Sequence, residues 1–511
     1  MSNGSGGRRL FLGCFFALVA TAFGFVVRAM ILDDWRAQFN LSGEQIGYLV
    51  GAGLYPFAIS IILFSLVVDR IGYGVSMVIA FAGHLASAVI TIFAGNFATL
   101  YLGTFLFALS NGIVEAVINP VVATIYDKQK THYLSVLHAG WPGGLVLGGL
   151  LAMTLGTGDT LGGVSGNLWQ WKVGLVVIPT LLYGFLLLGR KFPVQERVAA
   201  GVPYLDMLRE FGAASCLIVC YLLVQGLDQI LLVHQSALEP WMKVVLVVAP
   251  TAAFVYFVRS LGRPMFVFLM LIMMPLATTE LGTDSWIADL MSSVLASPDA
   301  GALVLIYTSL IMFVLRFFAG PIIHRISPLG LLAVSALIAA AGLFWLSSAG
   351  QAASVIFLAA TLYGVGKTFF WPATLGVVSE SFPRGGALTL NAIAGVGMLA
   401  VGVLGGPLIG TFQDQAFDRL MKQEDQALHA QVMTEKLGLL GRYNALDQAA
   451  LGNLDQENRE RVGEVVVISK QGTLARIAVL PLVMLACYLI LIAYFRSRGG
   501  YKPESIGSSG T

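Results

Sequence analysis

The sequence predicts an all-α membrane protein in which fourteen transmembrane helices form two six-helix pseudo-symmetric bundles plus two extra central helices. Three observations lead to this class: the composition, the number of long apolar runs and an internal repeat. Apolar residues make up 57% of the 511 residues and charged residues 11%, against about 25% charged residues in soluble domains. The mean hydropathy is +0.81. We therefore expect most of the chain to lie in a lipid bilayer.

The apolar runs are long enough to cross a bilayer. A spanning helix needs roughly 20 mostly apolar residues. Fourteen such runs occur, at residues 10–32, 44–68, 74–95, 98–124, 134–156, 171–190, 213–234, 241–259, 263–284, 301–323, 329–348, 353–378, 386–412 and 473–495. If the two runs between 213 and 259 form a re-entrant pair, twelve spanning helices remain.

A repeat relates the two halves of the chain. Residues 112–120 read GIVEAVINP and residues 364–372 read GVGKTFFWP, so that Glu115 occupies the position of Lys367. A charge in hydrocarbon costs roughly 2.5–3.5 kcal/mol on insertion scales, so it normally faces a bundle interior or a water-filled cavity. Two similar halves that each hold a charge at mid-membrane depth are typical of a transporter built from repeats. The match continues in Leu137-His138-Ala139 and Leu390-Asn391-Ala392.

The polar segments divide the chain into three parts. Residues 1–190 are predicted to form an N-terminal six-helix bundle, and residues 191–262 a cytoplasmic linker with two extra transmembrane helices. Residues 263–511 are predicted to form a C-terminal six-helix bundle with an extracytoplasmic insertion at 413–472. Apolar residues at helical spacing within 417–440 predict an amphipathic helical hairpin, which we interpret as a solvated cap.

Lys and Arg gather in the segments that follow even-numbered helices, and the positive-inside rule then places both termini in the cytoplasm. The first apolar run is longer than the 7–15 residues of a signal-peptide core, so we treat it as a retained helix.

The four cysteines all lie in predicted helices, and neither a disulfide nor a metal site is expected. No Walker-type phosphate loop occurs. We expect no cofactor and, because no nucleophile–base set or paired carboxylates occur, no enzyme activity.

A loop motif links the chain to a known family. Residues 65–72 read SLVVDRIG, which resembles the cytoplasmic loop motif G-x-x-x-D-R-x-G-R of the major facilitator superfamily, with serine in place of the first glycine. Tyr73 replaces the last basic residue, and residues 320–325 repeat the motif as GPIIHR. The resemblance implies a fold of six plus six helices and a cytoplasmic gate formed by Asp69, Arg70, Arg316 and Arg325.

Three short segments narrow this resemblance. Residues 112–120, 137–143 and 279–286 are similar to the fourth, fifth and seventh helices of the fucose-permease-like sugar–proton symporters. The acidic residue that those symporters carry in their first helix falls here at Ala29, next to Arg28. The resemblance implies a bacterial inner (plasma) membrane, a monomer, and a small-molecule substrate moved with protons, with no nucleic-acid partner.

The intramembrane charges are the first candidates for the site. A carboxylate in a partly dehydrated cavity is easier to protonate, so we expect Glu115 to carry or gate the proton. Lys367 either pairs with Glu115 or binds an anionic group of the substrate. Arg28 and Glu280 lie toward the outer ends of their helices, where they either pair as an outer gate or simply reach the interface, and Asp284 is expected at the interface.

Polar and aromatic residues beside the repeat motifs complete the predicted site. Amides and an aromatic platform suit a sugar, although hydrogen bonds between helices explain the asparagines almost as well. Asn111 is the stronger candidate because it shares a helix face with Glu115, and His138 is expected to tune Glu115 or simply to pack. The substrate-binding candidates are Asn111, Asn119, Lys367, Tyr363, Trp371, Asn391, Arg28 and Glu280.

These features predict a secondary active transporter that moves a small polar solute, such as a sugar, together with a proton by alternating access. An alternative within transport is an anionic sugar acid or carboxylate bound by Arg28 and Lys367. An alternative of another class is a non-transporting membrane solute sensor that signals through residues 413–472.

Overall fold

The computed structural model describes residues 5–155, 160–161, 164–165, 168–233, 236–284, 287, 291, 294–295, 298–350, 352–438 and 441–506. Trp286 of the 279–286 segment lies outside the described residues. We refer to residues 5–187 as the N half and to residues 264–497 as the C half.

The described elements of the N half are helices and one short antiparallel pair of strands. Its elements are α1 (Ser5–Met30), α2 (Leu32–Phe39), α3 (Gly43–Ile71), α4 (Tyr73–Ile92), α5 (Phe97–Ile125), α6 (Lys130–His138), α7 (Gly140–Thr154), β1 (Thr160–Leu161), β2 (Val164–Ser165), α8 (Leu168–Leu175) and α9 (Val177–Leu187). A capping box between Asn96 and Thr99 starts α5. The helix pairs α6–α7 and α8–α9 each make one broken span.

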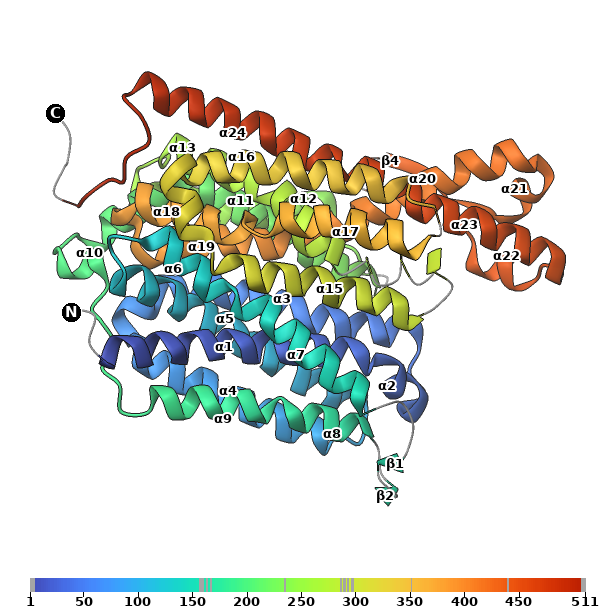
Figure 1. The fold of residues 1–511 in the computed structure, drawn as a ribbon, viewed down its shortest axis with the longest axis horizontal. Helices are drawn as coiled ribbons and strands as arrows, with labels where there is room; N and C mark the ends of the chain where they lie inside the picture. Colours follow the sequence, from blue (N-terminus) through green and yellow to red (C-terminus); the bar gives the residue numbers. More distant parts are fainter. Residues whose placement is uncertain are drawn as a thin grey trace.

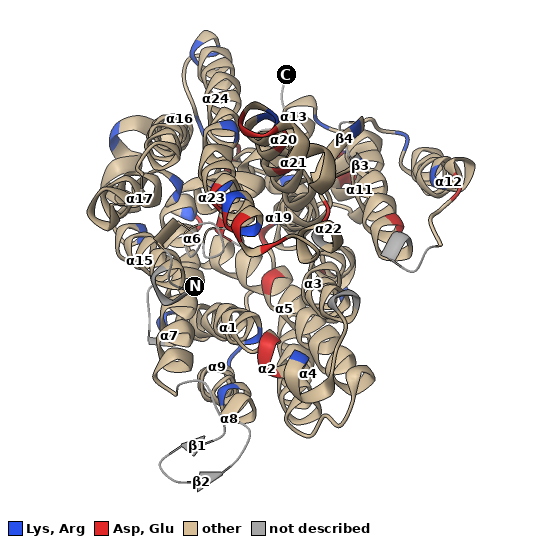
Figure 2. Ribbon diagram, turned by 90° about the vertical axis from the view of Figure 1, so that its right-hand side faces the viewer, with Lys and Arg blue, Asp and Glu red and all other residues tan. Residues whose placement is uncertain are grey.

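Between the halves lie a short helix and the two extra helices. These are α10 (Glu196–Ala199), α11 (Tyr204–Val233) and α12 (Pro240–Val258). Both α11 and α12 are long and apolar enough to cross a membrane, which favours spanning helices over a re-entrant pair. Figure 2, viewed along the bundle, shows α12 at the outer edge of the molecule.

The C half contains the remaining elements of the described chain. Its elements are α13 (Pro264–Ala277), the π-helical turn η1 (Thr278–Gly282), α15 (Pro298–Arg316), α16 (Ala319–Ser347), α17 (Ala353–Lys367), α18 (Phe370–Ser381), the 3-10 turn η2 (Pro383–Gly385), α19 (Gly386–Ala400), the π-helical turn η3 (Val401–Gly405), α20 (Gly406–Glu424), α21 (Gln426–Val432), β3 (Met433–Gly438), β4 (Gly441–Leu446), α22 (Gln448–Gly452), α23 (Gln456–Ile477) and α24 (Val479–Ser497).

The predicted number of spans agrees with the structure. In the described part of the chain, thirteen helices are long and apolar enough to cross a membrane, and Gly301–Arg316 is a shorter apolar helix at the position of the tenth predicted run. The backbone leaves the helical conformation at Ser327, where φ is 64°, and Pro328 begins the next span. Arg316 is the last residue of α15, and helical backbone resumes at Ala319 before the bend at Ser327.

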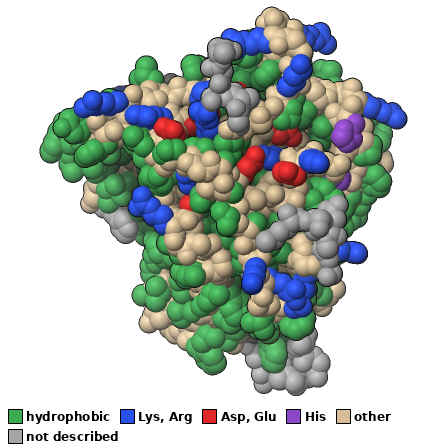
Figure 3. Space-filling view, turned by 90° about the vertical axis from the view of Figure 1, so that its left-hand side faces the viewer, with side chains coloured by type: hydrophobic (Ala, Val, Ile, Leu, Met, Phe, Trp, Pro, Cys, Tyr) green, Lys and Arg blue, Asp and Glu red, His purple; other side chains and the backbone are tan. Residues whose placement is uncertain are grey.

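The spanning helices lie side by side along the long axis of the molecule, with both termini at one end (Figure 1). We call this end the termini side, and the opposite end, which carries α21 and α22, the cap side. The face on the termini side displays Lys and Arg around its rim and acidic side chains nearer its middle (Figure 3).

The insertion at 413–472 differs in part from the prediction. Residues 417–432 are helical except at the α20–α21 junction, but Met433–Gly438 is a strand that pairs with Gly441–Leu446 in an antiparallel ladder, so the predicted helical hairpin over 417–440 is wrong in its last part. Gly441 has a φ of 104°, which a right-handed helix does not allow. The insertion has a small apolar core of its own, formed by Phe417, Met421, Leu428, Val432, Val462 and Val465.

Candidate functional site

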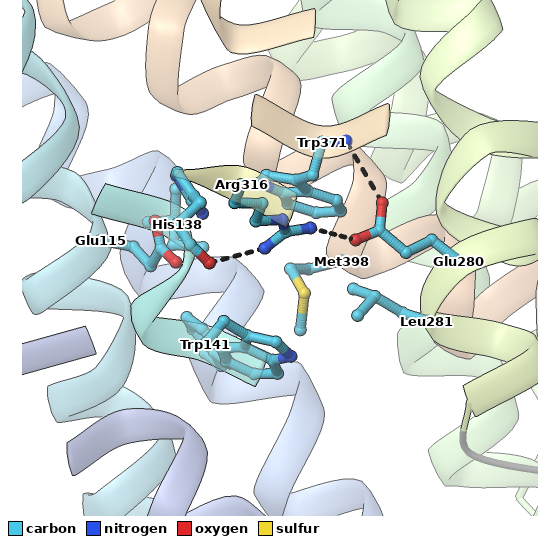
Figure 4. Close-up of a pocket in the computed structure, with 10 residues that line it drawn as sticks. Glu115, His138, Trp141, Glu280, Leu281, Arg316, Trp371 and Met398 are labelled. Atoms are coloured by element: carbon cyan, nitrogen blue, oxygen red, sulfur yellow. Dashed lines mark hydrogen bonds and ion pairs between the residues drawn. The ribbon is translucent and has the colours of Figure 1, made fainter. Parts of the chain in front are cut away.

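A narrow cavity lies between the two halves. Each half contributes five residues to its lining, and the cavity combines aromatic walls with four polar side chains (Figure 4). The lining residues are Phe57, Ile61, Glu115, His138 and Trp141 from the N half, and Glu280, Leu281, Arg316, Trp371 and Met398 from the C half.

On the N-half side, a chain of hydrogen bonds ends at Glu115. The side-chain amide of Asn119 donates to Glu115 Oε2 at 2.8 Å, and Asn119 Oδ1 lies 3.0 Å from His138 Nε2. Because an amide oxygen only accepts, His138 Nε2 carries the hydrogen. All three side chains are buried, and within the described residues Glu115 has no ion-pair partner. Its carboxylate is thus held by a neutral amide alone.

On the C-half side, Arg316 and Glu280 form a buried ion pair. Arg316 Nη2 lies 2.8 Å from Glu280 Oε1, and both side chains are at most 2% exposed. The backbone N–H of Trp371, in the first turn of α18, donates to Glu280 Oε2 at 3.2 Å. Arg316 also donates through Nε to the carbonyl of Thr368 at 2.8 Å and through Nη1 to the carbonyl of His138 at 2.6 Å. This guanidinium therefore contacts both halves.

A second buried ion pair joins Lys367 to Asp284. Lys367 Nζ also lies 4.9 Å from the centre of the Tyr363 ring, and the Tyr363 hydroxyl donates to the carbonyl of Thr279 at 2.6 Å. The expected pair between Lys367 and Glu115 is therefore not formed, and Asp284 is buried rather than interfacial. The reason is the spacing of four residues between Glu280 and Asp284, which places both carboxylates on one side of their helix, toward the two cations.

Several predicted substrate-binding residues lie outside the cavity lining. Asn111 Oδ1 lies 2.9 Å from His84 Nε2, and Asn391 Nδ2 donates to the carbonyl of Ala116 at 2.9 Å. Asn119 and Tyr363 make the bonds described above. Trp371 and Glu280 do line the cavity, together with Glu115 and His138.

Arg28 is held within the N half. Its guanidinium donates to Ser87 Oγ at 2.9 Å and lies 3.7 Å from the centre of the Phe107 ring. The expected outer gate between Arg28 and Glu280 is therefore not formed, because Glu280 is paired with Arg316.

The predicted gate is only partly located on the termini side. Asp69 pairs with Arg197 of α10 at 2.6 Å, and Arg70 lies 4.4 Å from the centre of the Tyr204 ring, so both bind the segment that joins the halves. Arg325 is exposed. Arg316, which was also assigned to this gate, lines the cavity and pairs with Glu280.

Contacts that join the halves on the termini side were not predicted. Thr131 Oγ1 of α6 donates to Glu380 Oε1 of α18, and Lys130 Nζ donates to the carbonyl of Ser379 at 3.4 Å. The apolar lining residues were also missed: Phe57, Ile61, Leu281 and Met398 have no sequence signal that separates them from core residues. Trp141 had one, since it lies in the 137–143 segment.

Two pseudo-equivalent helical halves around a central cavity with buried charges define the class of secondary membrane transporters. The chain belongs to the Major Facilitator Superfamily, since the model of that family matches residues 10–407.

Solved structures of this superfamily share the fold. FucP in the outward conformation matches with a TM-score of 0.57 and 15% identity, over 94% of this chain and 98% of that chain. The proton:xylose symporter XylE matches with a TM-score of 0.58 and 15% identity, over 94% and 95%. The human organic anion transporter MFSD10 matches with a TM-score of 0.58 and 13% identity, over 95% and 100%. A sequence comparison with curated proteins gives no match.

Proposed function

We propose that the protein is a proton-coupled symporter of a small polar solute, with a sugar as the first candidate, and that it works by alternating access. The observation that carries this proposal is Glu115, a buried carboxylate in the cavity lining whose hydrogen-bond partner is the neutral Asn119. An ionised carboxylate in such a place is costly, and a bound proton removes that cost. Protonation of Glu115 would therefore let the halves move around a neutral group.

The walls of the cavity support a solute with both apolar and hydroxyl surfaces. Trp141 and Trp371 line it from opposite halves, and an indole ring suits the CH face of a sugar. The Glu280–Arg316 pair offers acceptor and donor groups to hydroxyls from the C half. Among the similar folds, FucP of E. coli is described as a fucose:proton symporter and XylE as a proton:xylose symporter.

An anionic substrate remains the second candidate, since MFSD10 is described as an organic anion transporter. The charges of the cavity favour a neutral solute. Arg28 and Lys367, the two cations expected to bind an anion, lie outside the described lining, and Lys367 is neutralised by Asp284. Arg316 does line the cavity, but Glu280 compensates its charge.

We further propose the orientation and division of the chain. The basic rim of the termini side supports cytoplasmic termini under the positive-inside rule, with the bacterial inner membrane as the location (Figure 3). Residues 1–190, 191–262 and 263–511 would then act as a bundle, a linker with two helices, and a second bundle. The insertion at 413–472 would lie outside.

The test is a proton-flux assay in proteoliposomes. A panel of neutral sugars and sugar acids is added outside to wild type, Glu115→Gln and Glu435→Gln, the last being a control on an exposed cap glutamate. We expect one solute to alkalinise the medium with wild type and with Glu435→Gln. Glu115→Gln should lose this signal and retain solute exchange.

Two other outcomes would contradict the proposal. Proton flux that persists in Glu115→Gln would remove Glu115 from the coupling mechanism. Saturable binding without flux of any solute would favour a solute sensor instead.

A further inference from the structure

Three carbonyl groups around the cavity lack their helical donor because a proline follows four residues later. In an α-helix the carbonyl of residue i accepts from the N–H of residue i+4, and proline has no N–H. The three carbonyls are those of Ala116, His138 and Thr368, and the prolines are Pro120, Pro142 and Pro372.

Each of these carbonyls accepts a hydrogen bond from a side chain instead. Asn391 Nδ2 donates to Ala116 at 2.9 Å, Arg316 Nη1 to His138 at 2.6 Å, and Arg316 Nε to Thr368 at 2.8 Å. A buried carbonyl without a donor is costly, so a side chain that reaches it is held firmly. The prolines thus create acceptors at defined points of the backbone.

Two of the three bonds cross between the halves. Ala116 and His138 belong to the N half, whereas Asn391 and Arg316 belong to the C half. Asn391 is fully buried, and its Oδ1 has no partner in the described structure, so its amide is held here by the donor end alone. Figure 4 shows the guanidinium of Arg316 between Glu280 and the backbone of His138, with a bond to each.

We propose that these two bonds form a central clasp, in which Asn391 and Arg316 are positioning residues that bind proline-exposed carbonyls and hold the halves together in this conformation. The clasp must open in each transport cycle. It rests on the alternating-access part of the proposed function and not on the identity of the solute.

The clasp attaches to the segment that carries the proposed proton site. Ala116 follows Glu115 directly, and His138 is linked to Glu115 through Asn119. Opening the clasp therefore releases the N-half backbone next to Glu115 from its two hydrogen bonds to the C half.

The first experiment restores a missing donor. Pro142→Ala supplies an N–H that competes for the His138 carbonyl and leaves the Arg316–Glu280 pair untouched. Distances between spin labels report the conformation, with one pair at Lys128→Cys and Ile326→Cys on the termini side and another at Gly95→Cys and Ser354→Cys on the cap side. All four sites are exposed, and Cys14, Cys216, Cys220 and Cys487 are replaced beforehand.

We expect Pro142→Ala to raise the population of a separated conformation about tenfold, since a charge-assisted hydrogen bond is lost. Asn391→Ala, which removes a neutral bond, should raise it about fivefold. The control Pro250→Ala, in α12 outside both halves, should leave the distances unchanged. Unchanged distances in Pro142→Ala and Asn391→Ala would overturn the clasp.

A double-mutant cycle separates the clasp from a general loosening of helices. In the Arg316→Lys background, Pro142→Ala should change the separated population by less than about twofold. The guanidinium N–H that donates to the His138 carbonyl is already absent from that background. Full additivity of the two substitutions would overturn the proposal. If Pro142→Ala does not fold, Pro120→Ala combined with Asn391→Ala gives the same test at the other bond.

The outcomes also separate this inference from the proposed function. Distance shifts in the variants, together with no proton movement for any solute, would retain the clasp and reject the symporter. Proton symport with no distance shift in any variant would do the reverse.

Discussion

The two halves of the molecule treat their intramembrane charges differently. In the N half, Glu115 and Arg28 are held by neutral groups: an amide for Glu115, and a hydroxyl, a carbonyl and an aromatic ring for Arg28. In the C half, the charges Glu280, Arg316, Asp284 and Lys367 form two ion pairs. Equivalent positions of a repeat can therefore carry different roles, since Glu115 and Lys367 occupy the same position.

The backbone shows a related difference. Ala116 and Thr368 are equivalent in the repeat, and a proline four residues later removes the helical donor of each carbonyl. The carbonyl of Ala116 accepts from Asn391 of the opposite half, whereas that of Thr368 accepts from Arg316 of its own half. At this pair of equivalent positions, the C-half carbonyl is thus bonded within its own half, whereas the N-half carbonyl is bonded to the opposite half.

Breaking the Lys367–Asp284 pair should give the largest effect on stability. Lys367→Met leaves the buried Asp284 carboxylate uncompensated, and removing one partner of a buried pair costs about 3–5 kcal/mol. The free energy of unfolding of the purified protein in mixed micelles measures this loss.

The matched control removes both charges. Lys367→Met combined with Asp284→Leu should recover most of the lost stability, because an apolar replacement of a buried pair is often neutral. A single variant as stable as wild type would show that the pair does not compensate Asp284.

Two glycines at equivalent positions sharpen the comparison of the halves. A Cβ on Gly112 would lie 2.3 Å from the carbonyl oxygen of Phe57 and 2.9 Å from the backbone nitrogen of Ile61, whereas a Cβ on Gly364 would meet its neighbours at 3.4 Å or more. Gly112→Ala should therefore cost about 1–3 kcal/mol by overpacking α5 against α3. Gly364→Ala should be neutral or slightly stabilising, because alanine favours a helix. Equal melting temperatures of the two variants would contradict this close approach.

Much of the fold could be predicted from the sequence. Hydropathy located the fourteen spans because a membrane helix must satisfy its own backbone. The repeat identified Glu115 as a cavity residue, since a charged side chain at mid-membrane depth normally faces the bundle interior or a water-filled cavity. The spacing of apolar residues did not reveal the strands in the 413–472 insertion. There, apolar residues at helical spacing continue into a segment that forms antiparallel paired strands.

The partners of the charged side chains could not be predicted in the same way. Lys367 and Asp284 are 83 residues apart, and the repeat shows equivalent positions without showing which neighbour each faces. Asn111 and Glu115 share a helix face, but four residues turn a helix about 40° past a full turn. On a helix as buried as α5 this rotation is enough for Asn111 to reach His84 and for Glu115 to line the cavity.

Glu115→Gln should have a much smaller effect on stability than Lys367→Met. Glutamine keeps an oxygen that accepts from Asn119, and no charge is left without a partner, so the free energy of unfolding should change by no more than about 1 kcal/mol. The same unfolding assay in mixed micelles measures it. A loss as large as that of Lys367→Met would mean that the Glu115 charge is compensated after all.

The smallest effect is expected at Arg28. Its guanidinium contacts Ser87, the Gly24 carbonyl and the Phe107 ring, and it does not line the described cavity. Arg28→Gln should therefore change the affinity for any transported solute by less than about twofold, measured by equilibrium binding to the purified protein. Arg28→Lys, which keeps the charge, is the matched control. If Arg28→Gln alone lowered the affinity for an acidic solute by about tenfold, the N half would contain an anion site. The N-half charge at Arg28 would then serve to bind a charged partner, and would not simply be held by neutral groups.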